Sequence, residues 1–377
     1  MALINEVVLV PLLSKFGIRP ADPTFGRYLL HDTEEEKKHI SSHSHISIRQ
    51  RRVFISPSNE PGVFVKVGKG EDVELKEHEL ADARGKEWIF YKVWVSESEE
   101  AKKGKARGCD LVVSHGMCDY NGKWSPHVSS FLEMGFRVIA PDLAAHGRST
   151  GTHVYLPSAF DLTEGLHAVL TDVARWSNPR KTFLAGTSLG GWTSLAYALR
   201  YPNPPSRLSG LYLMAPLIGV APETMPPYPI YLIGIALRSF LGRLPFTPAV
   251  KGNVSDDPRV EEECYADERC YHGDLRIATG LALLEGLKSL LPSASKVDFP
   301  LHISHGAKDR ATDHKRSVEF IAAVRAAAKE RDISVDVDCK TWDGYEHVML
   351  KVGRDDEDDA KRQAVLAHMR EWLSDRV

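Results

Sequence analysis

The sequence predicts an α/β fold with a mostly parallel central sheet flanked by helices, and two observations carry this prediction. First, apolar runs of strand length recur along the chain, among them residues 109–116, 135–142 and 209–216. Second, helix-length stretches such as residues 159–177 and 317–330 separate these runs. Strands that are apolar throughout are buried on both faces, and their alternation with helices is typical of a parallel sheet.

The expected strands follow one another from residue 88 onward, and the last of them alternates between apolar and polar residues. They are residues 88–95, 109–116, 135–142, 181–188, 209–216, 299–306 and 332–342. In a parallel sheet, functional side chains gather at the carboxyl ends of the strands. We therefore look for a site in the loops that follow these runs.

Two segments stand outside the alternation. Residues 1–75 are predicted to be an N-terminal extension, whose middle is polar and mixed in charge. Residues 217–294 lie between two strands, are helical in tendency and are too long for a simple connection. We expect them to form a cap over the carboxyl edge of a core made of residues 76–216 and 295–377. The apolar side chains of this cap either line a site or pack it onto the core.

Composition and charge exclude some classes of function. The 377 residues include 48 Lys and Arg against 51 Asp and Glu, for a net charge of −3. Because no basic stretch is dense enough for a nucleic-acid groove, we expect no nucleic-acid partner. The 5 cysteines are odd in number and form no C-x-x-C pair, which argues against a disulfide framework and a structural zinc site. This pattern favours a reducing compartment.

The first residues of the chain are apolar but have no basic region and no small-residue cleavage site. Glu6 interrupts the apolar run, which is too short to span a bilayer. No signal peptide is therefore predicted, and we expect a cytoplasmic protein. Two interpretations of this segment stay open: it packs on the body as a helix or strand, or it anchors the protein peripherally to membranes or lipid droplets.

A G-x-S-x-G pattern places Ser188 between Gly186 and Gly190. The pattern alone is weak evidence, because glycine and serine are common enough for it to arise by chance. Its setting is more informative, since a strand-like run precedes it and a helix-like stretch follows. A serine on such a turn is held in a strained backbone that exposes its hydroxyl, and the glycines allow close backbone approach. We therefore interpret Ser188 as a nucleophile.

A serine nucleophile requires a base, and the base requires an orienting group. Of the 16 histidines, His347 is best placed, because it follows the predicted strand 332–342 and precedes the last helical stretch. We expect His368 to lie within that helix at the surface. His314 falls in the wrong loop for a base that comes last in the chain.

Two aspartates are candidates for the orienting acid. Asp309 follows the strand that ends near Ser304 within a short turn, from which a carboxylate could reach the imidazole. Asp313 is better suited to cap the helix that starts near His314, because Asp is favoured at that position. We therefore choose Asp309. The resulting order, Ser188 then Asp309 then His347, is known for one particular fold.

Acyl transfer also requires hydrogen-bond donors for the oxyanion of its tetrahedral intermediate. We expect the backbone N–H groups of Leu189, directly after the nucleophile, and of Met117, in the loop after the strand 109–116. His115 is expected to be a structural residue of that turn. This chemistry calls for no metal and no organic cofactor.

Together these residues resemble the α/β-hydrolase fold, in particular its monoacylglycerol lipase and lysophospholipase-like branch. The resemblance covers roughly residues 78–375 and includes Asp-x-x-x-His-Gly-x-Ser-x-Gly from Asp142 to Gly151. The other matching segments are VVSHGMCDYNGKW, LAGTSLGG, HGAKD and GYEHVML. Two departures bear on substrate preference: Met-Cys-Asp-Tyr follows His115-Gly116 where the family often has Glu-His, and Thr187 stands where a histidine is common.

The resemblance implies a serine hydrolase that cleaves carboxylic esters, above all lipid esters such as monoacylglycerols, through an acyl-enzyme. Its partner would be a small-molecule ester with an apolar acyl chain. Alternatives are hydrolysis of lysophospholipids, lactones or small esters, acyl transfer to an alcohol, and ligand binding on the same fold without catalysis. The last is least favoured, because all three triad residue types are present. The sequence predicts no oligomeric state.

Overall fold

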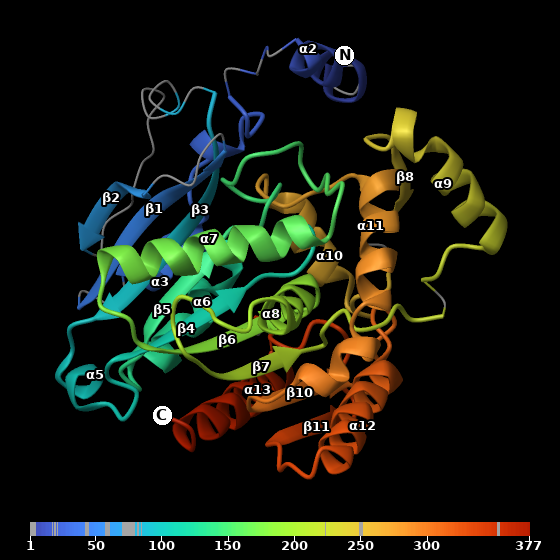
Figure 1. The fold of residues 1–377 in the computed structure, drawn as a ribbon. Coiled ribbons are helices and arrows are strands. Elements are labelled where there is room, and N and C mark those ends of the chain that lie inside the picture. The colour runs from blue at the N-terminus through green and yellow to red at the C-terminus, as the bar shows by residue number, and fades with distance from the viewer. Residues whose placement is uncertain are drawn as a thin grey trace.

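A computed structural model gives the fold of the chain. It describes residues 5–16, 18, 20, 22–41, 45–56, 61–69, 80, 83, 85–222, 224–248, 252–352 and 355–377. Among these residues, nine strands form one sheet with the spatial order β11-β10-β7-β6-β4-β5-β3-β1-β2 (Figure 1). The pairs from β5 to β11 in this order are parallel, whereas β3, β1 and β2 add to the sheet in antiparallel fashion.

The strands of this sheet are β1 (Ile46–Ser56), β2 (Val63–Lys69), β3 (Glu87–Ser96), β4 (Cys109–Ser114), β5 (Arg137–Pro141), β6 (Lys181–Thr187), β7 (Leu208–Met214), β10 (Leu301–Gly306) and β11 (Val337–Trp342). The α-helices are α2 (Val10–Lys15), α3 (Glu34–Ser41), α5 (Glu99–Lys103), α6 (Ser125–Leu132), α7 (Phe160–Trp176), α8 (Leu189–Arg200), α9 (Tyr228–Leu241), α10 (Pro258–Ala266), α11 (Ile277–Lys288), α12 (His314–Glu330) and α13 (Asp356–Ser374). Short turns of other helix types are η1 (Asn5–Leu9), η2 (Arg27–Leu29), η3 (Asn121–Trp124) and η4 (Leu291–Lys296).

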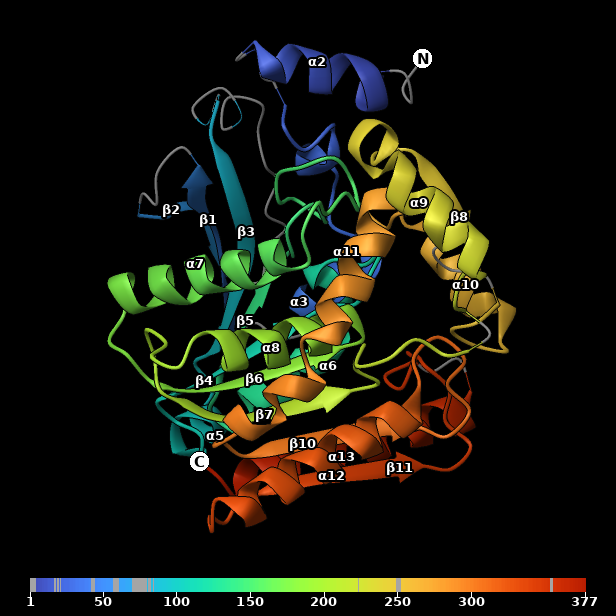
Figure 2. The same cartoon turned by 45° about the vertical axis from the view of Figure 1, so that its right-hand side comes forward.

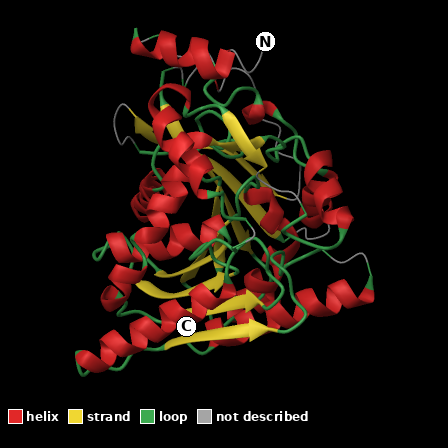
Figure 3. Ribbon diagram, turned by 90° about the vertical axis from the view of Figure 1, so that its right-hand side faces the viewer, coloured by secondary structure: helices red, strands yellow, loops and turns green. Residues whose placement is uncertain are grey.

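The predicted fold class is confirmed, since each apolar run expected to be a strand contains one. Successive residues of a strand point to opposite faces, and both faces of the central strands are buried. In β4, for example, Leu111 and Val113 contact one core, whereas Val112 contacts the other. The first core is covered by α6 and α13, and the second by α7, α8 and α12. Figure 3 shows helices on both sides of the strands.

Strands β1 and β2 fall within the predicted N-terminal extension, yet they are hydrogen-bonded into the central sheet. The sequence did not indicate this role, because β1 is polar and arginine side chains are usually exposed. In the structure β1 buries arginine side chains in specific contacts. Arg51 pairs with Asp172 of α7 at 2.9 Å. Arg52 lies over the rings of Tyr28 and Trp88, at 5.2 and 5.1 Å from their centroids. Pairing and cation–π contact make such burial tolerable.

The segment between β7 and β10 contains α9, α10 and α11, as its helical tendency predicted. No strand was expected in this helical segment, and that expectation is wrong: β8 (Pro245–Pro248) and β9 (Asp274–Arg276) pair in a small antiparallel ladder. Figure 2 shows α9 and α10 on the side toward which β7, β10 and β11 point.

Apolar side chains of α9 are exposed, above all Phe240 at 87% and Tyr228 at 70%. Within the described parts of the chain, no helix combines the length and the apolar character needed to cross a bilayer. Peripheral contact with a lipid surface therefore stays a prediction.

Candidate active site

Ser188 occupies the sharp turn between β6 and α8, with φ 51° and ψ −115°. This backbone conformation is rare for a residue with a side chain and is maintained only where the surroundings enforce it. Here the Ser188 N–H donates to the Met214 carbonyl at 3.1 Å, and its own carbonyl accepts from Trp192 at 3.1 Å and Leu217 at 3.0 Å. The strand-to-helix turn predicted from the sequence is thus present. Ser188 at this turn is partly exposed.

The glycines beside Ser188 are required by close backbone contacts. A Cβ on Gly186 would collide with the backbone of Gly190, and a Cβ on Gly190 would collide with the carbonyls of Ser114 and His115. The turn therefore packs directly against the end of β4, where the loop with Met117 begins. Glycine at these positions brings two candidate oxyanion donors into the same region.

A cavity of about 800 Å³ opens beside Ser188. Ser188, Met117 and His347 all line it. Most of the remaining wall is apolar and comes from the segment between β7 and β10. Its apolar members from that segment are Leu217, Val220, Pro226, Ile230, Tyr231, Phe246, Val254, Val260, Leu275, Ile277, Leu281, Leu283 and Leu284. This arrangement places a nucleophile candidate on the wall of a mostly apolar chamber.

His347 and Asp309 are brought together as the sequence predicted. The Nδ1 atom of His347 donates to Asp309 Oδ2 at 2.7 Å. The Asp309 side chain is fully buried, whereas the His347 side chain retains 10% exposure toward the cavity. Because Nδ1 carries the donated hydrogen, Nε2 remains as the basic nitrogen of a neutral imidazole.

Asp309 accepts more hydrogen bonds than the sequence predicted. The N–H groups of Ala311 and Thr312 donate to Oδ1, both at 2.8 Å. On Oδ2, the Thr312 hydroxyl donates at 2.8 Å and His305 Nε2 at 3.1 Å, beside His347. Burial alone would raise the pKa of the Asp309 carboxyl, but the charge of His347 and the hydrogen bonds from His305 and His347 hold it well below its usual value.

His305 and Thr312 were therefore missed as functional candidates. The signal that could have found His305 is its position four residues before Asp309, in the segment HGAKD that begins at the end of β10. His305 is fully buried between Asp309 and the Ser317 hydroxyl, which lies 2.9 Å from its Nδ1 atom. His305 and Thr312 donate to the same carboxylate oxygen as His347, and the Thr312 hydroxyl also lies 3.3 Å from His347 Nδ1.

The rejected candidates have other roles. Asp313 caps α12 by accepting from the Lys315 N–H at 3.0 Å, as predicted. His314 is the first residue of that helix. His368 lies in α13, but its expected place at the surface is wrong, because it is half-buried and lies 2.9 Å from the Tyr212 hydroxyl. Because Tyr212 belongs to β7, His368 packs against the sheet.

The two candidate oxyanion donors lie at the start of α8 and at the end of β4. Leu189 is the first residue of α8, so its N–H has no partner one turn earlier in the helix. Met117 follows His115 and Gly116, and a Cβ on Gly116 would lie 3.6 Å from Ser188 Cβ. The Met117 loop therefore passes directly over the nucleophile candidate.

His115 is a structural residue, as expected from the sequence. Its Nε2 atom accepts from the Leu143 N–H at 2.9 Å, and its Nδ1 atom donates to the Gly116 carbonyl at 2.7 Å. Burial, together with the neighbouring His146, lowers the pKa of His115 to about 3. A neutral imidazole fixed at both nitrogens supports the loop and is unavailable as a base.

Within the described residues, no group of three or more His, Cys, Asp or Glu side chains is arranged to hold a metal ion. The chemistry available at this site is that of a serine, a histidine and a buried carboxylate around an apolar chamber.

Comparison with known proteins agrees with this geometry. The family model described as serine aminopeptidase, S33, matches residues 105–336, which is more than half of the chain. Caffeoylshikimate esterase of Arabidopsis thaliana is 28% identical over 282 residues, covering 73% of this chain and 80% of that protein. Monoacylglycerol lipase of Mycolicibacterium smegmatis is 26% identical over 301 residues, covering 79% of this chain and 96% of that protein.

Solved structures show the same fold. A soluble variant of monoglyceride lipase from Saccharomyces cerevisiae superimposes with a TM-score of 0.60 at 21% identity, covering 77% of this chain and 92% of that one. Monoacylglycerol lipase of Paleococcus ferrophilus gives a TM-score of 0.59 at 19% identity, covering 71% and 95%.

Proposed function

The chain belongs to the serine aminopeptidase S33 family of α/β-hydrolases, and we propose that it hydrolyses carboxylic esters, most readily lipid esters such as monoacylglycerols. The observation that carries this proposal is the strained turn that presents Ser188 to an apolar cavity also lined by His347, whose imidazole is held by Asp309. These three residues are the proposed triad.

In the proposed reaction, Ser188 Oγ attacks the ester carbonyl while His347 Nε2 takes its proton. Asp309 holds the imidazole in the productive tautomer and stabilises the imidazolium that forms. The N–H groups of Leu189 and Met117 donate to the oxyanion of the tetrahedral intermediate. His347 then protonates the leaving alcohol, and water repeats the sequence on the acyl-enzyme.

The cavity supports an acyl chain as the part of the substrate that is bound. Its volume of about 800 Å³ lies in the upper part of the range for small-molecule sites, which is roughly 300–1,000 Å³. We propose that residues 217–294 act as a cap that supplies the apolar wall. The printed names of the relatives, a monoacylglycerol lipase among them, support a lipid ester.

The charges around the cavity favour a neutral alcohol over a phosphate-bearing one. Carboxylates of Glu35, Asp119 and Glu263 line it. Four cations line it. Three of them have carboxylate partners, which are Asp267 for Lys123 at 3.0 Å, Asp256 for Arg310 at 2.5 Å and Asp257 for Lys351 at 3.2 Å. The fourth, Arg276, donates to the backbone carbonyls of His153 and Arg243 at 2.9 and 2.6 Å. This balance leaves little positive charge to bind a phosphate, so a monoacylglycerol suits the site better than a lysophospholipid.

The test is hydrolysis of p-nitrophenyl esters and monoacylglycerols of graded acyl length by the purified protein. We expect activity to rise with acyl length and to fall by about 10⁴-fold or more in Ser188→Ala, because an unassisted water replaces the nucleophile. The matched control is Ser194→Ala, which removes a buried hydroxyl from α8, the helix that Ser188 precedes. This variant should keep wild-type activity.

A wild-type protein that hydrolyses none of these esters would overturn the proposed activity. Equal activity in wild type and Ser188→Ala would overturn the role of Ser188. Activity confined to short acyl groups would keep the mechanism but reject the lipid substrate.

A further inference from the structure

A network of buried charges joins residues 30–41, called the N-terminal segment below, to the core and to the loop after α10. Its five members come from distant parts of the chain and have side chains no more than 3% exposed. They are Asp32, Glu36, Lys92, Arg148 and Arg269. Charges buried to this degree are strongly destabilising unless each is paired, so the network must form as a unit.

The two carboxylates of the N-terminal segment are shared among three cations. Lys92 Nζ lies 2.7 Å from Glu36 Oε1 and 3.3 Å from Asp32 Oδ2. Arg148 and Arg269 contact Asp32 Oδ1 at 2.9 and 3.1 Å, and Arg269 also pairs with Glu36. Burial would raise the pKa of the Glu36 carboxyl, but Lys92 and Arg269 hold it below its usual value, so it is ionised at neutral pH.

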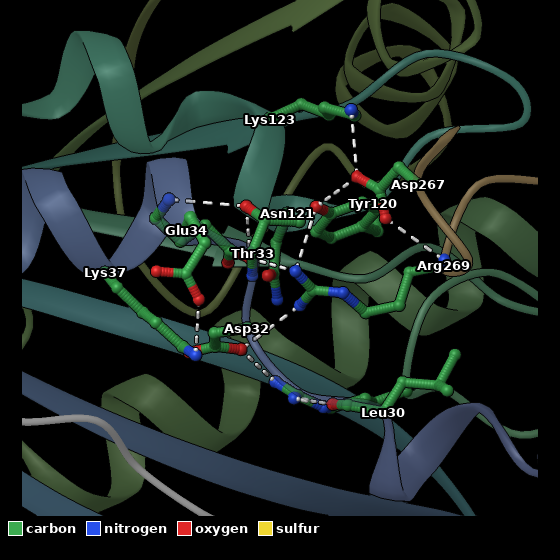
Figure 4. Close-up of polar contacts among 12 residues, drawn as sticks. Leu30, Asp32, Thr33, Glu34, Lys37, Tyr120, Asn121, Lys123, Asp267 and Arg269 are labelled. Carbon is green, nitrogen blue, oxygen red and sulfur yellow. Dashed lines mark hydrogen bonds and ion pairs between the residues drawn. The ribbon is translucent and has the colours of Figure 1, made fainter. Parts of the chain in front are cut away.

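The side chain of Arg269 connects this network to the loop that contains Met117. Its guanidinium lies 4.0 Å from the centroid of the Tyr120 ring and donates to the Tyr120 hydroxyl at 2.9 Å. That hydroxyl donates in turn to Asp267 at 2.6 Å, and Lys123 pairs with the same carboxylate at 3.0 Å. Figure 4 shows Arg269 beside Tyr120 and Asp267, with Asp32 below them.

The backbone of the same loop is held as well. The Asn121 N–H donates to Asp142 at 2.7 Å, and the Cys118 carbonyl accepts from the Tyr271 N–H at 2.9 Å. A Cβ on Gly122 would collide with the Glu36 carboxylate, which therefore occupies the space that a side chain would take. Residues 118–123 are thus packed between the N-terminal segment, the core and the loop after α10.

We propose that this network positions the oxyanion hole, so that the N-terminal segment around Asp32 and Glu36 is part of what makes the enzyme active. The inference rests on the proposed function, in which the Met117 amide stabilises the oxyanion. Met117 directly precedes the held residues, and an oxyanion donor loses most of its effect when it is displaced from the developing charge. Glu36, Arg269 and Tyr120 are positioning residues, because none of them contacts the reacting atoms.

The first variant is Tyr120→Phe, which removes the hydroxyl between Arg269 and Asp267 without removing a charge. We expect kcat to fall by about tenfold while KM changes by less than about twofold, because the loss concerns the transition state rather than the ester ground state. The affinity for a trifluoromethyl ketone, whose adduct carries the oxyanion, should fall by the same factor as kcat. The pH dependence of kcat/KM should keep its midpoint, since the contact between Asp309 and His347 is untouched.

The second variant is Glu36→Gln, which should lower kcat by about a hundredfold, close to the loss of one oxyanion donor. Two matched controls separate positioning from general destabilisation. Glu34→Gln changes an exposed carboxylate on the same helix, and Asp110→Asn breaks a buried pair with Arg137 at the other end of the sheet. Both controls should keep wild-type kcat at temperatures where they are folded.

Wild-type kcat and inhibitor affinity in a folded Tyr120→Phe protein would overturn the inference. So would an equal loss of kcat in Asp110→Asn and Tyr120→Phe. If Glu36→Gln fails to fold, Tyr120→Phe decides alone. A failure of the proposed function is a different result, because then the wild-type protein itself would be inactive on esters.

Discussion

The two ends of the central sheet bury aspartates in different surroundings. At the amino end, Asp110 at the start of β4 accepts two hydrogen bonds from Arg137 at the start of β5, at 2.8 and 2.6 Å. At the carboxyl end, Asp309 accepts from two N–H groups, the Thr312 hydroxyl and two histidines. One aspartate faces a permanent cation, and the other faces an imidazole that lines a cavity.

The difference shows how a buried carboxylate can serve either stability or chemistry. The guanidinium of Arg137 cannot lose its proton, so the pair at the amino end has one state. In the proposed mechanism, the imidazole of His347 gains and loses a proton, and its partner must stabilise both states without moving. We expect the additional donors around Asp309 to serve this purpose, by holding the carboxylate when the charge of His347 changes.

The largest expected effect separates these two aspartates. Asp309→Asn should lower kcat by about 10⁴-fold, because an asparagine amide favours the wrong tautomer of His347. Asp110→Asn should leave kcat unchanged and lower the free energy of unfolding by about 3–5 kcal/mol, because Arg137 is left buried without its counter-charge. Ester kinetics and urea unfolding of both variants measure these effects. A large loss of kcat in Asp110→Asn would contradict the distinction between a structural Asp110 and a functional Asp309.

The same contrast explains what could be predicted from the sequence. The central strands were predicted because both of their faces are apolar. The positions of Ser188, Asp309 and His347 were predicted from loops that follow strands. Local sequence carries both signals.

The contacts that could not be predicted join residues far apart in the chain. Arg51 of β1 is buried because Asp172 lies beside it, 121 positions later. Glu36 and Arg269 are 233 positions apart. A polar stretch such as β1 or α3 is typical of surface until its partner is known, so the sequence predicted an extension where the structure has strands and a charge network.

A smaller effect concerns protonation at both ends. Burial lowers the pKa of His115 to about 3 and of His146 to about 4, near the carboxyl end, and of His302 to about 3, at the amino end. In the unfolded chain these groups titrate near 6.5. The unfolded state therefore binds more protons below that value, and stability is lost as the pH falls from about 6.5 toward 4.

Each of these histidines should lower the free energy of unfolding by up to about 1.4 kcal/mol per pH unit in that window. Urea unfolding at pH 7, 6 and 5 measures the slope. His302→Gln should remove the contribution of one proton to this slope, which is about 1.4 kcal/mol per pH unit. It should leave kcat at pH 7 unchanged, because His302 lies at the start of β10, away from the cavity. A slope that is flat between pH 5 and 6.5 would mean that these imidazoles are protonated in the folded protein.

The smallest expected effect tests the extra donors on Asp309. His305→Leu removes one of five hydrogen bonds to the carboxylate, so kcat should fall by about tenfold with KM unchanged, since a hydrogen bond to a charged group contributes about 1.5–3 kcal/mol and the other donors compensate in part. His305→Gln, whose amide can reach the same oxygen, should restore most of the loss. If His305→Leu keeps wild-type kcat while losing stability, the donors beyond His347 serve only to bury the charge, and Asp309 then resembles Asp110 in everything but the proton that its partner exchanges.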